Sequence, residues 1–299
     1  MISICIPVYN YPVAPLIGSL FQQAKTLDTD VELVCIDDHS DEAFLQQNKE
    51  AMSMTDKQVY LDENVGRARI RNLFLEHTQG EWLLFLDNDM RIGEDFLRRY
   101  ADTLSSQPEV VVGGVAYEAE KEGDKDYSLR LYYGKKVESR SVRFRNRHPY
   151  RSFMTGNFMI RRSLLESIGF DDRITGYGHE DTLFGYRMQQ RGVRILHIDN
   201  PAVNGNVETN AEFLTKTEEA VENLVKIYRF MQDEPAFCLS VKLLQTYNCL
   251  RRAGVAGMVE DAWLRWKRTL RQQLTEGKKI SVKKFNFYKL GLFIHLNKH

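Results

Sequence analysis

"EWLLFLDNDM", residues 81–90, joins a short apolar run to a cluster of acids. The run is apolar over five residues, which is typical of a strand buried on both faces of a sheet. Asp87 and Asp89 follow it with one residue between them, so both side chains can turn toward one point. Clustered carboxylates without His or Cys suit a hard divalent cation such as Mg²⁺ or Mn²⁺. A turn held by local hydrogen bonds is the alternative explanation.

The segments around this stretch alternate between apolar runs and amphipathic helical patterns. Expected strands cover residues 2–8, 31–37, 57–62, 109–118 and 193–199, with helical patterns at 14–27, 42–52, 65–78 and 93–106. This alternation predicts an α/β fold with a mainly parallel, mixed sheet between helices. From residue 210 the pattern is helical, so we expect one domain at 1–209 and a helical extension at 210–299.

Polar residues follow four of the expected strands, where an open parallel sheet binds its ligands. They are Pro7, Tyr9 and Asn10, then Asp37 and Asp38, then Asp62 and Asn64, then Asp87, Asn88 and Asp89. The turn after the first strand, "PVYNYP", contains no glycine, whereas dinucleotide and P-loop sites require a glycine-rich turn there. Hydride transfer and P-loop chemistry are therefore disfavoured. Nucleotidyl transfer loses support for the same reason.

Composition places the chain among ordinary globular proteins, with 43% hydrophobic and 27% charged residues. No signal peptide or membrane-spanning run is evident, so a cytoplasmic location is expected. Net charge is zero, but residues 251–299 carry 12 Lys and Arg against 3 Asp and Glu. This basic, aromatic tail suits peripheral contact with an anionic membrane surface, or packing of Phe285, Phe287, Leu292 and Phe293 on the body.

A second basic, aromatic segment, "RFRNRHPYR" at residues 143–151, lies within a stretch without clear periodicity. The residues fit a solvated surface loop or a lid over an anionic ligand, and one sequence does not separate the two.

Six segments in order resemble the motifs of glycosyltransferase family 2, inverting enzymes with the GT-A fold. They are "ISICIPVYN", "LVCIDDHSDE", "ENVGRARIRN", "WLLFLDNDM", "TGNFMIRRSLLESIGFDD" and "GYGHEDTLFGYRMQQRG", within residues 1–205. The last is similar to chondroitin-polymerase-type domains and to the C-terminal motif of galactosyltransferases. The resemblance implies that residues 1–209 are a GT-A catalytic domain that binds a nucleotide sugar.

The resemblance also implies roles for individual residues. Donor binding is expected of Pro7, Tyr9, Asp38, Asn64, Gly66, Arg71, Asn88, Gly156 and Asn157. Asp87 and Asp89 match the metal-binding pair, with Mn²⁺ or Mg²⁺ as cofactor. Arg71 and arginines of residues 143–151 are expected to neutralise the UDP diphosphate.

One position departs from the family pattern. The chondroitin-polymerase type has a metal-binding His downstream of the Glu-Asp pair, where this chain has Asn204. An amide oxygen binds Mn²⁺ more weakly than imidazole does. His197, within an expected strand, is a possible substitute ligand, although a strand histidine is more often a packed core residue.

Glu180 and Asp181 stand where a helical pattern begins, so they suit either a helix cap or catalysis. A helix N-terminus would also lower the pKa of an acid there. The resemblance implies that Asp181 is the catalytic base and that Glu180 binds the acceptor.

Together these features predict a metal-dependent inverting glycosyltransferase that moves a hexose or N-acetylhexosamine from a UDP-sugar. The expected acceptor is a glycan or a lipid-linked glycan of surface polysaccharide synthesis, and no nucleic-acid partner is expected. The alternative is a catalytically weak or inactive nucleotide-sugar-binding scaffold on the same fold, for which Asn204 is the supporting feature.

Overall fold

The computed structural model describes residues 1–118, 121–278 and 280–298. Its main sheet has seven strands in the order β3-β2-β1-β4-β8-β6-β9. Their bounds are β1 (Ile2–Val8), β2 (Val31–Asp37), β3 (Lys57–Tyr60), β4 (Trp82–Leu86), β6 (Val110–Val112), β8 (Asn157–Arg161) and β9 (Ile195–His197). All neighbours pair in parallel except β8, which is antiparallel to β4 and β6. The expectation of a mainly parallel, mixed sheet is confirmed.

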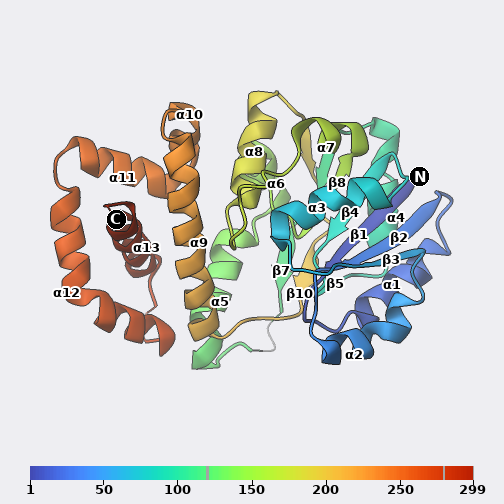
Figure 1. The fold of residues 1–299 in the computed structure, drawn as a ribbon, viewed down its shortest axis with the longest axis horizontal. Coiled ribbons are helices and arrows are strands. Elements are labelled where there is room, and N and C mark those ends of the chain that lie inside the picture. The colour runs from blue at the N-terminus through green and yellow to red at the C-terminus, as the bar shows by residue number, and fades with distance from the viewer. Residues whose placement is uncertain (119–120, 279, 299) are drawn as a thin grey trace.

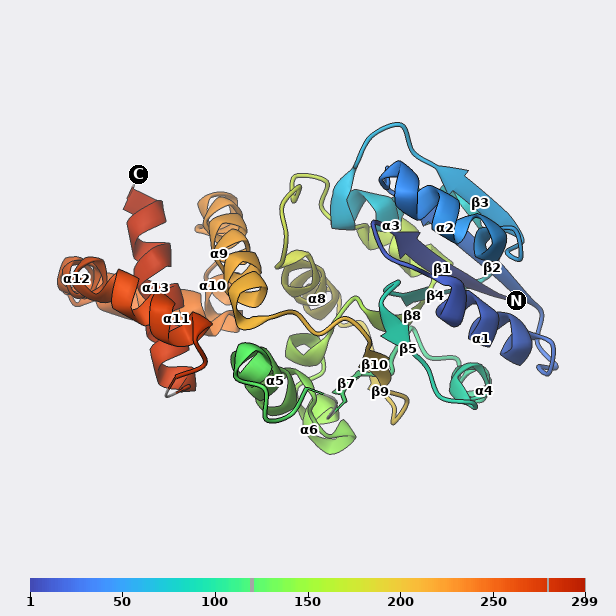
Figure 2. The same cartoon turned by 90° about the horizontal axis from the view of Figure 1, so that it is seen from below.

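Helices cover both faces of this sheet (Figures 1 and 2). On one face lie α1 (Ala14–Ala24), α2 (Glu42–Met52) and α4 (Phe96–Ala101), and on the other lie α3 (Gly66–His77), α7 (Arg162–Ile168) and α8 (Glu180–Gln190). Leu84 and Leu86 of β4 pack toward the first set, and Leu83 and Phe85 toward the second. Because both faces are buried, β4 is apolar at every position.

A three-stranded sheet forms beyond the carboxyl end of β4. It comprises β5 (Met90–Arg91), β10 (Ala202–Asn204) and β7 (Val115–Tyr117), in that order. The acidic turn of residues 87–89 connects β4 to β5, and β10 pairs with both β5 and β7. This small sheet therefore brings Asn204 to the turn that carries the acids.

The stretch from 121 to 152 is made of short helical elements. They are η2 (Lys125–Tyr127), α5 (Ser128–Tyr133), η3 (Gly134–Glu138), α6 (Val142–Arg147) and η4 (Tyr150–Ser152), while η1 (Leu104–Ser106) follows α4. Arg145 of α6 is buried, and its guanidinium donates to the carbonyls of Val112, Gly113 and Ile198. Residues 143–151 thus fold as two short helices with His148 and Pro149 between them, and Arg145 ties α6 to the sheet.

The described residues after 209 are mainly helical (Figure 1). The helices are α9 (Asn210–Met231), α10 (Pro235–Ser240), α11 (Lys242–Arg252), α12 (Ala256–Thr275) and α13 (Val282–Lys298). Thr209 and Glu212 form a capping box that starts α9. Phe285 and Phe293 of α13 are buried against neighbouring helices and Leu292 is partly buried there, so these side chains pack on the body. Phe287 instead lines a cavity.

One hydrophobic cluster contains both Phe85 of the sheet and Phe293 of α13, so the core continues across residue 209. The division into 1–209 and 210–299 stays a prediction. Among the described residues, no helix has the length and apolar character needed to span a bilayer.

Candidate active site

The carboxyl ends of β1, β2 and β4 open into a cleft of about 470 Å³. Predicted site residues that line it are Pro7, Tyr9, Asp38, Asn64, Gly66, Arg71, Asp87, Asn88 and Asp89. An adjoining cavity of about 210 Å³ shares Asp87 and Asp89 with the cleft. It is lined by the predicted residues Gly156, Asn157, Glu180, Asp181 and Asn204. The fold therefore brings residues that are far apart in the chain together around two connected cavities.

Asp38 organises the loop before α3. Its Oδ1 accepts from the Val65 amide at 2.7 Å and its Oδ2 from the Gly66 amide at 3.1 Å. Gly66 has a φ of 81°, which favours glycine. Burial raises the pKa of Asp38, while the two amide donors oppose that rise. The Asn64 side chain also donates to the backbone carbonyl of Asp38. Asp38, which is expected to bind the nucleotide base, therefore also holds the loop on this side of the cleft.

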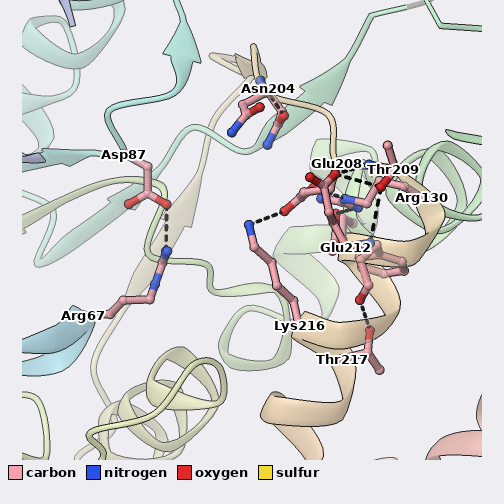
Figure 3. Close-up of polar contacts among 12 residues, drawn as sticks. Arg67, Asp87, Arg130, Asn204, Glu208, Thr209, Glu212, Lys216 and Thr217 are labelled. Carbon is pink, nitrogen blue, oxygen red and sulfur yellow. Dashed lines mark hydrogen bonds and ion pairs between the residues drawn. The ribbon is translucent and has the colours of Figure 1, made fainter. Parts of the chain in front are cut away.

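Asp87 is held by two arginines of α3. Its Oδ2 lies 2.9 Å from Arg67 Nη2 (Figure 3). Its Oδ1 lies 2.7 Å from Arg71 Nη2. Burial works to raise the pKa of Asp87, but the two guanidinium groups outweigh it and lower that pKa. Arg71 is only 1% exposed and faces Asp87, so it lies at the back of the cleft. The main interaction of Arg71 in this structure is therefore the ion pair with Asp87, and not the expected direct contact with a diphosphate.

Arg67 was not identified from the sequence. Its Nε lies 3.0 Å from Glu180 Oε1, so one side chain joins the Asp-x-Asp turn to the Glu-Asp motif. It lines both cavities and keeps 41% of its side chain exposed. The available signal was its position one turn before Arg71, which puts both arginines on one face of the helix.

The described residues contain no group of three His, Cys, Asp or Glu that could hold a metal ion. Asp89 nonetheless fits a cation, because no hydrogen bond or ion pair to its carboxylate is found in the described part of the chain. Burial, and next the charge of Asp87, raise the pKa of Asp89 to about 6. A nearby cation would relieve this cost. Asn204, which lines the same cavity, brings an amide oxygen that accepts from the Asn206 amide at 3.1 Å.

His197 does not belong to this set. Its Nδ1 lies 3.2 Å from Arg145 Nη1 and its Nε2 lies 3.0 Å from the Pro149 carbonyl oxygen. The ring is buried in β9 and lines neither cavity. The idea that His197 replaces the missing ligand is therefore not supported, because both ring nitrogens already face other groups.

Gly156 and Asn157 shape the site rather than offer free polar groups. A Cβ on Gly156 would come within 3.1 Å of Asp87 Oδ2, and the Gly156 carbonyl accepts from the Asp87 amide. Asn157 accepts from the Tyr100 hydroxyl and donates to the carbonyls of Gly114 and Asn200. The amide of Asn157 is thus occupied by hydrogen bonds that connect neighbouring loops, and the sequence motif does not reveal these contacts.

Glu180 and Asp181 begin α8, but neither is the N-cap. That position is His179, which has a φ of 68° and makes no side-chain cap bond. The Asp181 Oδ1 accepts from the Thr182 amide at 2.6 Å, and no described residue donates to its Oδ2. Burial and then the charge of Glu180 raise the pKa of Asp181. The expected lowering by the helix terminus is therefore outweighed.

Several polar residues around the smaller cavity also escaped sequence reasoning. Lys216 of α9 lies 2.9 Å from Glu208 Oε1, and Arg130 of α5 lies 2.8 Å from Glu208 Oε2 (Figure 3). Glu208 is the centre of this group, whose members come from α5, α9 and the loop between β10 and α9. Lys216 also lines both cavities, so it is a second cation besides Arg67 at their junction.

Comparisons with known proteins agree with this architecture. A sequence profile described as Glycosyl transferase family 2 matches residues 3–169, more than half of the chain. A second, described as N-terminal domain of galactosyltransferase, matches residues 135–209. The chain is 23% identical over 265 residues to EpsH of Bacillus subtilis (strain 168), covering 80% of this chain and 76% of EpsH. It is 24% identical over 269 residues to chondroitin synthase of Escherichia coli, covering 79% of this chain and 39% of the synthase.

Two solved structures share the fold. The mannosyltransferase PcManGT from Pyrobaculum calidifontis, in complex with GDP-Man and Mn²⁺, has a TM-score of 0.58 at 16% identity, covering 99% of this chain and 85% of that one. S. aureus TarS 1-349, in complex with UDP-GlcNAc, has a TM-score of 0.53 at 18% identity, covering 99% and 90%. The fold is thus the GT-A type, and the protein is a glycosyltransferase. The chain belongs to glycosyltransferase family 2.

Proposed function

We propose that the protein transfers a hexose or N-acetylhexosamine from a UDP-sugar to a hydroxyl of a glycan or lipid-linked acceptor, with inversion and with a divalent cation. Surface polysaccharide synthesis is the setting we favour. The observation that carries the proposal is the position of Asp181, which lines both the cavity of Asp87 and Asp89 and a further cavity of about 460 Å³. A base at such a junction can face donor and acceptor together.

The donor side has the features that a nucleoside diphosphate needs. Tyr9 is 51% exposed at the mouth of the cleft, where its ring can stack on a base. Arg67 and Lys216 lie at the inner end and can meet the charge of a diphosphate. TarS, of the same fold, has been solved with UDP-GlcNAc, which agrees with a UDP-sugar as donor.

Asp89 is the residue best suited to hold the cation, with Asn204 as a further oxygen ligand and Asp87 held beside it by arginines. Mn²⁺ is present in the PcManGT complex, which supports a divalent ion here. Such an ion would offset negative charge on the leaving diphosphate. Mn²⁺ and Mg²⁺ both suit an all-oxygen site.

Asp181 is proposed to act as the base through its Oδ2. The acceptor hydroxyl gives its proton to this oxygen while its own oxygen bonds to the anomeric carbon. The bond between that carbon and the diphosphate breaks, and UDP leaves with the electron pair. A raised pKa improves a carboxylate as a proton acceptor. Glu180 Oε2, buried without a partner among the described residues, is free to accept from a second acceptor hydroxyl.

A thermal-shift screen tests the donor. UDP-sugars with Mn²⁺ should raise the melting temperature, since a ligand that binds only the native state stabilises it. GDP-mannose serves as the comparison, because a mannosyltransferase of the same fold was solved with it. Stabilisation by GDP-mannose alone would contradict the donor assignment. Binding of UDP-sugars without any transfer or hydrolysis across an acceptor panel would favour the inactive scaffold instead.

A further inference from the structure

We infer that the groove leading away from Asp181 binds an acceptor chain that carries negative charges, as phosphodiester or carboxylate groups. The inference rests on the proposed function for the role of Asp181, but its evidence is separate. It comes from the shape and the charge of the space between the η3–η4 segment and helices α11 and α13.

The groove consists of two cavities that share one wall. The cavity that contains Asp181 measures about 460 Å³, and a further one beyond it measures about 770 Å³. Both are lined by Tyr133, Val137, Arg140, Phe144, Arg151 and Lys242. We call the two cavities together the acceptor groove. The combined volume of the acceptor groove exceeds what one sugar needs, so it suits a chain rather than a monosaccharide.

Basic side chains gather in the outer cavity of this groove. Arg140, Arg151, Lys242, Lys283 and Lys289 line it, and no Asp or Glu does so among the described residues. The chain as a whole has equal numbers of acidic and basic residues, so this separation is local. Like charges that line a concave surface focus the potential and attract an anion.

Within the described ranges, these five cations have no carboxylate partners at ion-pair distance. No ion pair joins any of them to a described acid, whereas Arg67, Arg71 and Arg130 around the donor cavity are each paired. Arg140 instead lies 5.0 Å above the Phe144 ring, and its Nε donates to the Val137 carbonyl. The acceptor groove therefore has donors available for an anionic ligand.

Lys289 strengthens the case from α13. Its ammonium lies 5.2 Å from the centre of the Tyr133 ring and 4.6 Å from that of Phe285, and the side chain is partly buried. Burial lowers the pKa of Lys289 to about 8, although the charge of Glu138 opposes this. An anion in the outer cavity would restore the preference for the charged form.

Aromatic rings accompany the cations, which favours a charged glycan over a bilayer. Phe144 is 41% exposed, and Phe287 lines the same cavity, so a sugar ring can stack beside an anionic group. A flat bilayer cannot follow a concave groove to Asp181. The buried Phe285 and Phe293 are likewise unavailable for insertion into lipid.

Binding of a defined polyanion tests the inference. Fluorescent dextran sulfate is compared with neutral dextran of equal length by anisotropy, at low and moderate salt. The test variant combines Arg151→Ala with Lys242→Ala. The control combines Arg265→Ala with Arg268→Ala, which removes the same charge from exposed positions of α12. Melting temperatures check folding, and the single variant Lys242→Glu provides a second test of the same wall.

Dextran sulfate should bind much more tightly than dextran, and salt should weaken it. The groove variant should lose about tenfold in affinity and the control less than about twofold. Equal binding of dextran, or equal losses in both double variants, would overturn the inference. The inference would also be overturned if binding of anionic phosphatidylglycerol vesicles required Arg151 and Lys242 while binding of dextran sulfate did not. Arg151 and Lys242 line neither cavity that contains Asp89, contrary to the expectation that arginines of residues 143–151 meet the diphosphate. UDP affinity with Mn²⁺ should therefore stay unchanged in every variant, and a lack of UDP binding by the unaltered protein would count against the proposed function instead.

Discussion

Nη2 of Arg71 lies 2.7 Å from Oδ1 of Asp87, so a fully buried guanidinium neutralises the first acid of the Asp-x-Asp turn. The Arg71 Nη1 also donates to the Arg67 carbonyl, which fixes the side chain within α3. A buried charge that loses its partner is costly, whereas a surface pair contributes little. The pair is thus part of the fold as well as part of the site.

Arg71→Met should destabilise the protein by about 3 kcal/mol, because Asp87 would keep only the half-exposed Arg67 as a partner. Urea unfolding measures the change. Lys278→Met is the control, since the Lys278–Glu276 pair is exposed and should contribute less than about 1 kcal/mol. Equal effects of the two substitutions would show that the buried pair has no special weight.

Asp181→Asn should abolish sugar transfer and leave UDP binding nearly intact. The amide keeps an oxygen for the Thr182 N–H but cannot take a proton from the acceptor. Transfer is followed by UDP release, and UDP affinity by calorimetry. Asp261→Asn, on the exposed surface of α12, should leave both unchanged. Near-normal turnover of the Asp181 variant would refute the base assignment.

The same substitution should alter stability in a pH-dependent way. The pKa of Asp181 is raised in the folded protein to about 7 from 3.8, so the folded state binds the proton more strongly than the unfolded state does. Stability contributed by the protonated acid is present at low pH and is lost as pH rises through the folded pKa. The free energy of unfolding of Asp181→Asn, relative to that of the wild type, should therefore rise by roughly 1 to 3 kcal/mol between pH 5 and pH 8 without metal. A pH-independent difference in unfolding free energy would contradict the raised pKa.

Local patterns in the sequence predicted most of the sheet, because β4 is buried on both faces and its acids follow at once. The single strand expected at 109–118 is wrong, since β6 and β7 belong to different sheets. Most of the predicted strand-end residues line one cleft, since the carboxyl ends of parallel strands share one edge, but Asp37 and Asp62 line neither cavity. Contacts across long sequence separations were beyond such patterns. Arg67 donates a hydrogen bond to Glu180 across 113 positions of the chain. The Asn157 side chain accepts from the Tyr100 hydroxyl and donates to the Asn200 carbonyl. The pKa of Asp181 also depends on burial, which spacing alone does not give.

Gly156→Ala should weaken metal-dependent UDP binding. The new Cβ would lie about 3.1 Å from Asp87 Oδ2, and the carboxylate cannot move freely because Arg67 and Arg71 hold it. Gly93→Ala is the matched control, as nothing lies within 4 Å of the added carbon there. We expect a loss of about tenfold in UDP affinity with Mn²⁺ for the first and little change for the second. Similar affinities would mean that the acid tolerates displacement.

Asn204 offers a direct test of the cation site, because it stands where related enzymes are expected to have a histidine. Asp89→Ala should remove the dependence of UDP binding on Mn²⁺, since it deletes the carboxylate that has no other described partner. Asn204→Ala should weaken that dependence.

Asn204→His should instead strengthen Mn²⁺-dependent UDP binding by several-fold, roughly, because imidazole is a better ligand for Mn²⁺ than an amide oxygen is. Titration of Mn²⁺ at fixed UDP by calorimetry measures the effect. Asn286→His, on α13 and outside both cavities that contain Asp89, controls for adventitious binding by an added imidazole. If Asn204→His gains no more than Asn286→His, Asn204 does not face the cation, and the third ligand must come from elsewhere.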